Sequence, residues 1–167
     1  HYNVHYLGRD YIQFCLVGSG SEFDTLKRMA DGLKISEYTT FTGRVSDSVF
    51  LEVLNTADVC VNSDAVTPMN DMSTMNKVME YMALGKPIVQ FELHEGRYSA
   101  QDASLYANPN DTIDFAQKIV VLLDDPGLRL RMGEFGKKRV YEELAWSHEQ
   151  PKLLAAYRAL RSQQDLA

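Results

Sequence analysis

Short apolar runs of strand length alternate with amphipathic patterns of helical length along most of this 167-residue chain. The runs of strand length cover residues 12–17, 39–42, 58–61 and 87–91. Apolar residues recur at helical spacing over 22–33, 46–57, 73–85, 111–123, 126–143 and 147–160. The strand runs are apolar throughout, which predicts strands that are covered on both faces. The expected fold class is therefore α/β, with an open parallel, Rossmann-like sheet flanked by helices.

Composition and charge limit the classes of function. A length of 167 residues suits one domain with a hydrophobic core, and no apolar run approaches the ~18 residues of a membrane span. The net charge of −6 argues against a nucleic-acid partner, because phosphate binding on that scale needs a basic surface. The chain begins with His1 rather than Met and carries no visible signal peptide, which predicts a piece of a longer protein.

The two cysteines, Cys15 and Cys60, both lie within strand-like apolar runs. This placement predicts two buried, reduced thiols in a cytoplasmic protein. A structural metal site would need more ligands at closer spacing. The sequence "ELHEGR" sets His94 between two glutamates, but the spacing matches no standard metal site, so no metal is expected.

Open parallel sheets bind ligands at the carboxyl ends of their strands. The loops that follow the expected strands are 18–22, 43–46, 62–73 and 92–101. The loop over 62–73, "NSDAVTPMNDMS", is long, polar and rich in helix breakers. A loop of this length in a compact domain is usually functional.

The stretch "NKVMEYMALGKPIV" over 76–89 predicts a helix that Ser73 or Thr74 caps. Asn76, Lys77 and Glu80 share one side of its beginning. A helix N-terminus and a lysine suit a phosphate group, and a carboxylate one turn deeper can accept hydrogen bonds from a ribose diol. The alternative is a solvated Lys77–Glu80 ion pair on an ordinary helix.

Two other loops carry weaker signals. The turn "GSGSE" over 18–22 lets the backbone approach a ligand, but Phe23 breaks the GxGxxG pattern, so a plain strand-to-helix turn is an equal alternative. In "FTGRV", Arg44 follows Gly43 at the end of a strand and could reach a phosphate or stack on a base. A simple exposed arginine is at least as good an interpretation.

Together these segments resemble the nucleotide-binding half of a group 1 (family 4) glycosyltransferase of the GT-B type. The segments that carry the resemblance are "LVGSGSE", "FTGRV", "ADVCVNSD", "NKVMEYMALGKPIV" and "LRMGEFGKKRV". The variant around residues 69–91 is similar to bacterial surface-polysaccharide transferases. The resemblance implies that residues 1–167 form the C-terminal, nucleotide-sugar-binding half of a GT-B fold, including a C-terminal helix at about 147–163.

The resemblance also implies an activity. Such enzymes transfer a sugar, with retention, from a nucleotide-sugar donor to a sugar or lipid-linked acceptor in bacterial polysaccharide or glycoconjugate biosynthesis. A UDP-sugar is favoured over a GDP-sugar, and neither metal nor other cofactor is expected. The implied location is the cytoplasm at the inner membrane face, with peripheral membrane association of the whole enzyme.

Residue by residue, the resemblance assigns the ribose hydroxyls to Glu80. The family's other glutamate falls at Met72, so Asp71 beside it becomes the candidate catalytic residue that contacts the donor sugar. The remaining donor-nucleotide contacts fall on Ser73, Thr74, Asn76, Lys77, Gly18, Gly20, Arg44 and Val45.

Part of the expected machinery lies outside residues 1–167. His1–Leu7 looks like the end of the first helix, so the first strand, its basic pair and the N-terminal acceptor domain are expected to be missing. We therefore expect weak nucleotide binding, negligible transfer and an exposed apolar face on the last helix.

Two other functions compete with this interpretation. A non-catalytic module that binds nucleotide diphosphates would share the architecture, and Met72 favours it slightly. A dinucleotide-dependent dehydrogenase would need a full glycine fingerprint and an acidic ribose residue, for which Asp31 and Glu37 are the nearest candidates.

Overall fold

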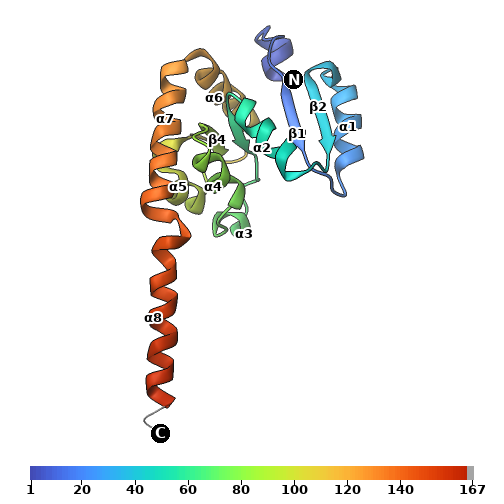
Figure 1. The fold of residues 1–167 in the computed structure, drawn as a ribbon. Helices are drawn as coiled ribbons and strands as arrows, with labels where there is room; N and C mark the ends of the chain where they lie inside the picture. The colour runs from blue at the N-terminus through green and yellow to red at the C-terminus, as the bar shows by residue number, and fades with distance from the viewer. Residues whose placement is uncertain (165–167) are drawn as a thin grey trace.

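The computed structural model describes the backbone of residues 1–164 and the side chains of residues 1–161 (Figure 1). Its strands are β1 (Phe14–Val17), β2 (Thr39–Gly43), β3 (Cys60–Asn62), β4 (Ile88–Phe91) and β5 (Ser104–Ala107). Its α-helices are α1 (Phe23–Gly32), α2 (Asp47–Thr56), α3 (Pro68–Asp71), α4 (Asn76–Ala83), α5 (His94–Ala100), α6 (Thr112–Asp124), α7 (Pro126–Arg139) and α8 (Trp146–Gln164). Short helical turns are η1 (Tyr2–Tyr6), η2 (Ser36–Tyr38), η3 (Gln101–Ala103) and η4 (Val140–Leu144).

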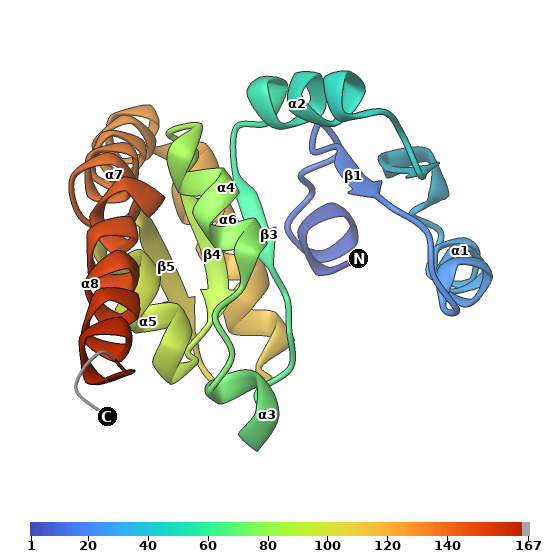
Figure 2. The ribbon, with the colours of Figure 1, turned by 60° about the horizontal axis from the view of Figure 1, so that its bottom comes forward.

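All strands pair in parallel, but they form two sheets instead of one. β1 pairs with β2, and β3, β4 and β5 form the second sheet in that order. Figure 2 shows β1 set apart from β3, and each of these two strands leaves one edge without a neighbouring strand among residues 1–164. The parallel α/β class is confirmed, whereas the expectation of strands covered on both faces holds for β4 alone among the predicted strands.

The first sheet is poorly covered. Cys15 and Leu16 in β1 are exposed, whereas every residue of β4 is buried. The prediction of two buried thiols is therefore right for Cys60 and wrong for Cys15. The physical reason is that β1 packs mainly on β2 and no helix of the described residues packs closely over the face that carries the Cys15 side chain.

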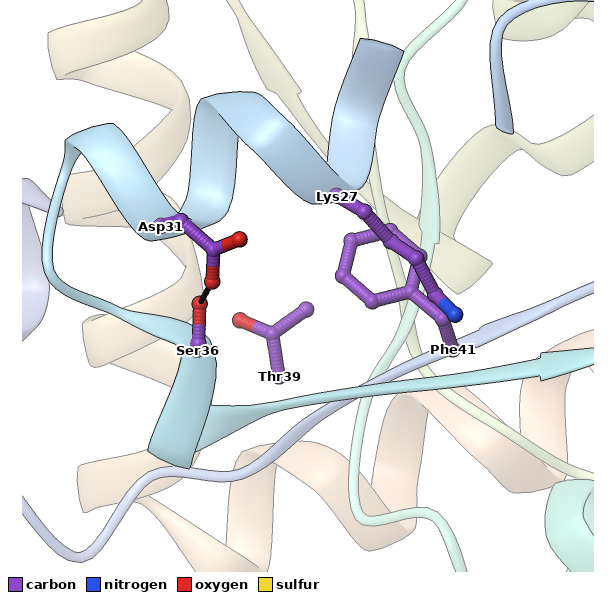
Figure 3. Close-up of a pocket in the computed structure, with 5 residues that line it drawn as sticks. All are labelled: Lys27, Asp31, Ser36, Thr39 and Phe41. Atoms are coloured by element: carbon purple, nitrogen blue, oxygen red, sulfur yellow. Dashed lines mark hydrogen bonds between the residues drawn. The ribbon is translucent and has the colours of Figure 1, made fainter. Parts of the chain in front are cut away.

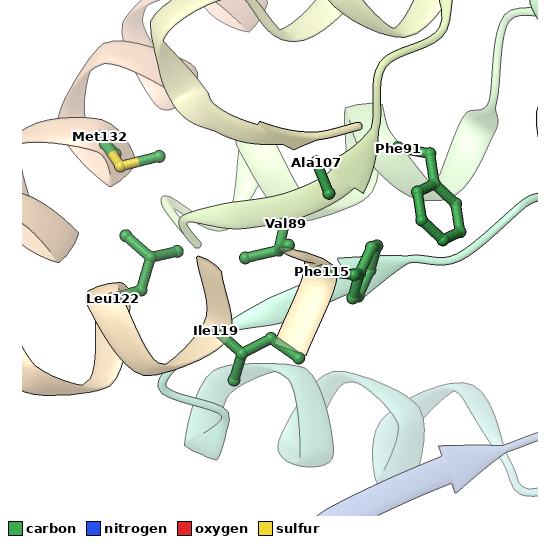
Figure 4. Packing of buried hydrophobic residues seen from close by; sticks show 7 residues of the cluster. All are labelled: Val89, Phe91, Ala107, Phe115, Ile119, Leu122 and Met132. Carbon is green, nitrogen blue, oxygen red and sulfur yellow. The ribbon is translucent and has the colours of Figure 1, made fainter. Parts of the chain in front are cut away.

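The main core lies on the second sheet. Val89 and Phe91 of β4 pack with Phe115, Ile119 and Leu122 of α6, together with Ala107 and Met132 (Figure 4). A second cluster joins Val78 and Met82 of α4 to Ile88, Ala100 and Ala103. The first sheet reaches the main cluster through Phe14, which is partly buried against it.

Two contacts fix the helices around the second sheet. A Cβ atom built on Gly133 of α7 would lie 2.1 Å from the carbonyl oxygen of Gly85, so α7 lies too close to the turn after α4 for any side chain there. Arg139, buried near the end of α7, donates to the carbonyl oxygens of Tyr98 and Ser99 at 3.0 Å each. These bonds satisfy acceptors at the C-terminus of α5.

The amino-terminal part is attached to the larger sheet by polar and apolar contacts. Val4 in η1 is buried, and this turn packs on α6. Arg9 forms a bidentate pair with Asp124, with both nitrogen–oxygen distances at 2.7 Å. Such bidentate pairs fix the relative orientation of the two side chains and are stronger than pairs with a single hydrogen bond.

Several predicted helix boundaries are confirmed. Ser46, Asp111 and Asp125 cap α2, α6 and α7 through side-chain oxygens, and Pro126 occupies the first turn of α7. Three elements were not predicted: α3 and α5 lie within expected loops, and β5 was not recognised. The expected cap Ser147 lies inside α8, which begins one residue earlier.

The last helix, α8, continues beyond α7 and projects away from the sheets (Figure 1). Its apolar side chains Leu153, Leu154, Tyr157 and Leu160 are exposed, as expected for this face. Within the described residues, no helix is both long and apolar enough to cross a membrane.

Candidate functional site

The beginning of α4 has free backbone donors. The N-cap residue is Met75, and no side chain caps the helix. The prediction that Ser73 or Thr74 caps it is wrong, because the Ser73 hydroxyl donates to the carbonyl oxygen of Met69 at 2.6 Å and the Thr74 hydroxyl donates to Glu95, also at 2.6 Å. The amide groups at the helix start therefore remain available to a ligand.

Lys77 and Glu80 do not pair with each other. The Nζ atom of Lys77 lies 2.8 Å from Oδ2 of Asp64, in the loop after β3. Glu80 is exposed, and its carboxylate makes no hydrogen bond or ion pair within the part of the chain that the structure describes. The solvated Lys77–Glu80 pair considered from the sequence is thus absent, and the Glu80 carboxylate is open to a ligand.

Asp71, the candidate contact to the donor sugar, uses one carboxylate oxygen to bind the start of α5. Its Oδ1 accepts a hydrogen bond of 2.7 Å from the backbone N–H of His94, at the start of α5. Its other oxygen, Oδ2, has no hydrogen bond among the described side chains. Met72 beside it is 74% exposed and offers no charge.

The glycine turn after β1 borders a hollow at the carboxyl end of the first sheet. Gly18 has φ +130°, a backbone conformation that other residues rarely adopt. A cavity of about 260 Å³ is lined by this turn and by α1 and β2. Its lining residues include Gly18, Gly20, Phe23, Leu26 and Phe41. This mixture of apolar side chains and exposed backbone suits a flat ring better than a charged group.

Arg44 and Val45 follow Gly43 at the carboxyl end of β2, where the sequence placed them. Arg44 is exposed, and no ion pair or hydrogen bond holds its side chain within the described residues. The predicted donor contacts thus form two groups, one at the carboxyl end of each sheet.

A second cavity of about 300 Å³ lies beside η2 and α1 (Figure 3). It is lined by Lys27, Asp31, Ser36, Thr39 and Phe41. Thr39 is the first residue of β2, so this cavity opens toward the amino end of the strand. Ser36 donates to Asp31 across it, so part of its polar surface is already satisfied. Phe41 lines both cavities, and only the first is bordered by the glycine turn.

Sequence reasoning missed two buried polar side chains, those of Asn62 in β3 and Gln90 in β4. The Nδ2 atom of Asn62 donates to Oε1 of Gln90 at 3.4 Å, and Nε2 of Gln90 donates to the carbonyl oxygen of Gly96 at 3.3 Å. Asn62 is 1% exposed and Gln90 is fully buried. These polar residues connect β3, β4 and α5; a polar residue inside an apolar strand run was the only signal that could have revealed them.

Two buried groups near α4 titrate far from neutrality. Burial, with smaller contributions from Cys60, Glu80 and Asp64, raises the pKa of Tyr81 to about 12. Burial raises the pKa of the Cys60 thiol to about 11. Neither group can act as a general base near pH 7. Among the described residues, no cluster of three or more histidine, cysteine or acidic side chains could hold a metal ion.

Comparison with solved structures identifies the fold. A glycosyltransferase from Rickettsia africae ESF-5 superposes with a TM-score of 0.76 at 17% identity, over 89% of this chain and 40% of that one. The S. aureus protein TarM, in a complex that includes UDP, superposes with a TM-score of 0.74 at 17% identity, over 89% of this chain and 29% of that one. The chain has the α/β architecture of part of the GT-B glycosyltransferases.

Comparison of sequences gives the family. The lipopolysaccharide core biosynthesis glycosyltransferase LpsE of Rhizobium meliloti (strain 1021) is 29% identical over 123 residues. The match covers 72% of this chain and 34% of LpsE, so the chain spans about a third of the length of this relative. The family model described as "Glycosyl transferases group 1" matches residues 4–125, well over half of the chain. The chain therefore belongs to the group 1 glycosyltransferases.

Proposed function

We propose that this chain binds the nucleotide part of a nucleotide-sugar donor for retaining glycosyl transfer. The observation that carries the proposal is the uncapped beginning of α4, which has Lys77 beside it and the unpaired carboxylate of Glu80 one turn further along. Free N–H groups and an ammonium favour a diphosphate, and an unpaired carboxylate favours a ribose diol. Family membership supports the same assignment.

The proposed roles follow from the groups that the site offers. The amide groups at the start of α4 and the side chains of Asn76 and Lys77 contact the diphosphate, whose negative charge grows as the sugar leaves. The Glu80 carboxylate accepts hydrogen bonds from the ribose. Oδ2 of Asp71, which is free of hydrogen bonds among the described residues, accepts a hydrogen bond from the donor sugar.

The base and ribose extend toward the turn that contains Gly18 and Gly20 and toward Arg44 and Val45. The cavity of about 260 Å³ beside this turn supports a flat ring in this position. UDP is the favoured nucleotide and GDP the runner-up, and the UDP in the TarM complex is consistent with that order.

We propose that residues 1–167 are the donor half of a larger enzyme, and that the acceptor-binding domain lies outside them. The short overlap with LpsE supports this division. The open edges of β1 and β3 support a further strand between the two sheets, contributed from outside residues 1–167. Hydrogen exchange tests this part: amides of β1 should exchange much faster than those of β4 in this chain, whereas equal protection would contradict it.

The acceptor is proposed to be a sugar or lipid-linked molecule of bacterial polysaccharide or glycoconjugate synthesis. The name of LpsE supports the lipopolysaccharide branch of that class. Peripheral association with the inner face of the cytoplasmic membrane belongs to the same proposal. Family membership gives no support to the dehydrogenase considered from the sequence.

A non-catalytic module that binds nucleotide diphosphates is the second candidate. The observation that favours it is the exposed thioether of Met72 at the position where the resemblance expects a glutamate. Both candidates bind the nucleotide, so binding cannot distinguish them. They differ in whether the whole enzyme transfers the sugar. Transfer of a labelled sugar by the whole enzyme would exclude the non-catalytic module.

Titration with UDP, GDP, ADP and NADH tests the proposed function, with NMR as the readout because weak binding is expected. We expect millimolar binding of one nucleoside diphosphate, shifts that centre on residues 73–80, and no NADH binding. Incubation of the chain with a labelled UDP-sugar and an acceptor should give no transfer. Failure of all three diphosphates to bind would overturn the proposal for this chain.

A further inference from the structure

Two side-chain hydrogen bonds join the end of α3 and the loop that follows it to the first turn of α5. Asp71 accepts from the backbone N–H of His94 at 2.7 Å, and Thr74 donates its hydroxyl proton to Oε2 of Glu95 at 2.6 Å. Asp71 and Thr74 lie three positions apart, and their partners in α5, His94 and Glu95, are adjacent. The intervening segment, Met72 and Ser73, is therefore held at both ends.

Hydrogen bonds also fix the direction of the two hydroxyl groups before α4. A serine or threonine just before a helix offers a hydroxyl oxygen to the first N–H groups of that helix, and Thr74 is two residues before Asn76, the spacing of a local hydroxyl-to-backbone bond. Here the Ser73 hydroxyl is bonded to Met69 and the Thr74 hydroxyl to Glu95. Met75, the residue at the N-cap, has no side-chain oxygen that could take their place.

We infer that Glu95 is a positioning residue of the proposed donor site: by holding the Thr74 hydroxyl, it keeps the N–H groups at the start of α4 free for the donor diphosphate. Glu95 touches no part of the donor and acts through Thr74. The inference rests on the proposed function, since it takes the diphosphate to bind at the start of α4. It adds a residue from α5 that the resemblance did not assign.

The contact is suited to this role by its chemistry. An ionised carboxylate accepts more strongly than a backbone carbonyl or a neutral amide, so it competes well for the Thr74 hydroxyl. Glu95 lies in the first turn of α5, where the helix dipole favours a negative charge. Asp71 accepts a hydrogen bond from the backbone N–H of His94, the residue before Glu95, so the backbone that carries Glu95 is held in place.

A positioning role and a purely stabilising role of Glu95 predict different effects of Glu95→Ala on nucleotide affinity and melting temperature. If Glu95 only stabilised the fold, Glu95→Ala would lower the melting temperature and the nucleotide affinity together. On our account the freed Thr74 hydroxyl instead turns to the N–H of Asn76 and caps the helix. The new cap offsets the lost bond, so the melting temperature stays close to that of the unmodified chain while the affinity falls.

The experiment compares UDP affinity, by NMR titration, and melting temperature across four variants. Glu95→Ala should bind UDP about five- to tenfold more weakly, the effect of losing about one hydrogen bond to the phosphate. Glu95→Gln keeps an acceptor oxygen and should retain most of the affinity. The Thr74 hydroxyl is bound to Glu95 and is therefore not itself proposed to contact the donor, although the resemblance assigned it such a contact. Glu95→Ala combined with Thr74→Val has no hydroxyl left to cap the helix, so it should regain most of the loss.

Asp31→Ala is the matched control, because it removes another carboxylate that accepts from a hydroxyl, that of Ser36, beside α1. It should leave UDP affinity unchanged. The inference is overturned if Glu95→Ala binds UDP like the unmodified chain, if adding Thr74→Val restores nothing, or if affinity and melting temperature fall together. In these cases the unmodified chain still binds UDP and the proposed function stands. An unmodified chain that binds none of UDP, GDP and ADP overturns both.

Discussion

Lys77 forms its ion pair with Asp64, whose Oδ2 lies 2.8 Å from Nζ, and forms none with Glu80 on its own helix. Asp64 follows β3, so the pair connects the loop after that strand to the beginning of α4. The side chains of Lys77 and Asp64 are 41% and 30% exposed. At this exposure the pair adds little stability, and the lysine can turn to a phosphate at small cost.

Lys77→Met should therefore weaken UDP binding about tenfold and leave uridine binding unchanged, because uridine has no phosphate for the ammonium to contact. Asp64→Asn should raise UDP affinity slightly, since it removes a competing negative charge. Paired titrations with UDP and uridine measure both effects. An equal loss for uridine in Lys77→Met would mean that the lysine acts through the fold.

The contact between α7 and the turn after α4 leaves no room for a side chain. Gly133→Ala would place a Cβ atom 2.1 Å from the carbonyl oxygen of Gly85, so the helices must move apart. We expect the free energy of unfolding to fall by about 1–3 kcal/mol, as for other overpacked sites. Denaturant unfolding measures the change. Gly32→Ala in α1 is the control, because its Cβ would meet nothing within 4 Å, and a comparable loss there would contradict the explanation.

The two cysteines should react at very different rates. Cys15 is exposed on β1, whereas Cys60 is buried and its pKa is raised to about 11 by burial. The thiolate is the reactive form, so Cys60 is both shielded and protonated near pH 8. Mass spectrometry after iodoacetamide treatment should find label on Cys15 first and on Cys60 only in denaturant. Equal labelling in the native state would be inconsistent with this structure.

The chain should lose stability in alkali. Burial raises the pKa of Cys60 from 9.0 to about 11, and the pKa values of Tyr81 and Tyr106 from 10.0 to about 12. The unfolded chain therefore releases these protons first, and the free energy of unfolding should fall as pH rises from about 9 to about 12. Below pH 9 these groups should have no effect. Unfolding curves across this range give the slope of the free energy of unfolding against pH. Tyr81→Phe should make this slope shallower between pH 10 and 12.

The parts of the fold that were predictable from sequence are those with a local signal. Helical spacing and capping residues such as Ser46 and Asp111 located α2 and α6, and an apolar run located β4. The division into two sheets was not predictable, because pairing between strands far apart in sequence leaves no local pattern. β5 was missed because only Leu105 and Tyr106 are bulky in its four residues, between the small Ser104 and Ala107, so it forms no continuous apolar run.

The candidate site shows the same division between local and long-range information. Lys77 and Glu80 could be chosen from their spacing on one helix, but the partner of Lys77 lies 13 residues away. Thr74 was expected to cap α4 because that is its local preference. Its actual partner, Glu95, belongs to a helix 21 residues further along, so only the three-dimensional structure could identify the contact.

The central claim is that the Glu80 carboxylate faces a ribose, and a double comparison tests it most directly. UDP and 2′-deoxy-UDP are titrated into the unmodified chain, Glu80→Ala and Glu134→Ala, the last being a control at an exposed glutamate of α7. The account predicts that the unmodified chain and the control bind UDP about tenfold more tightly than 2′-deoxy-UDP, and that Glu80→Ala binds both equally weakly. Retained preference for UDP in Glu80→Ala would contradict the claim.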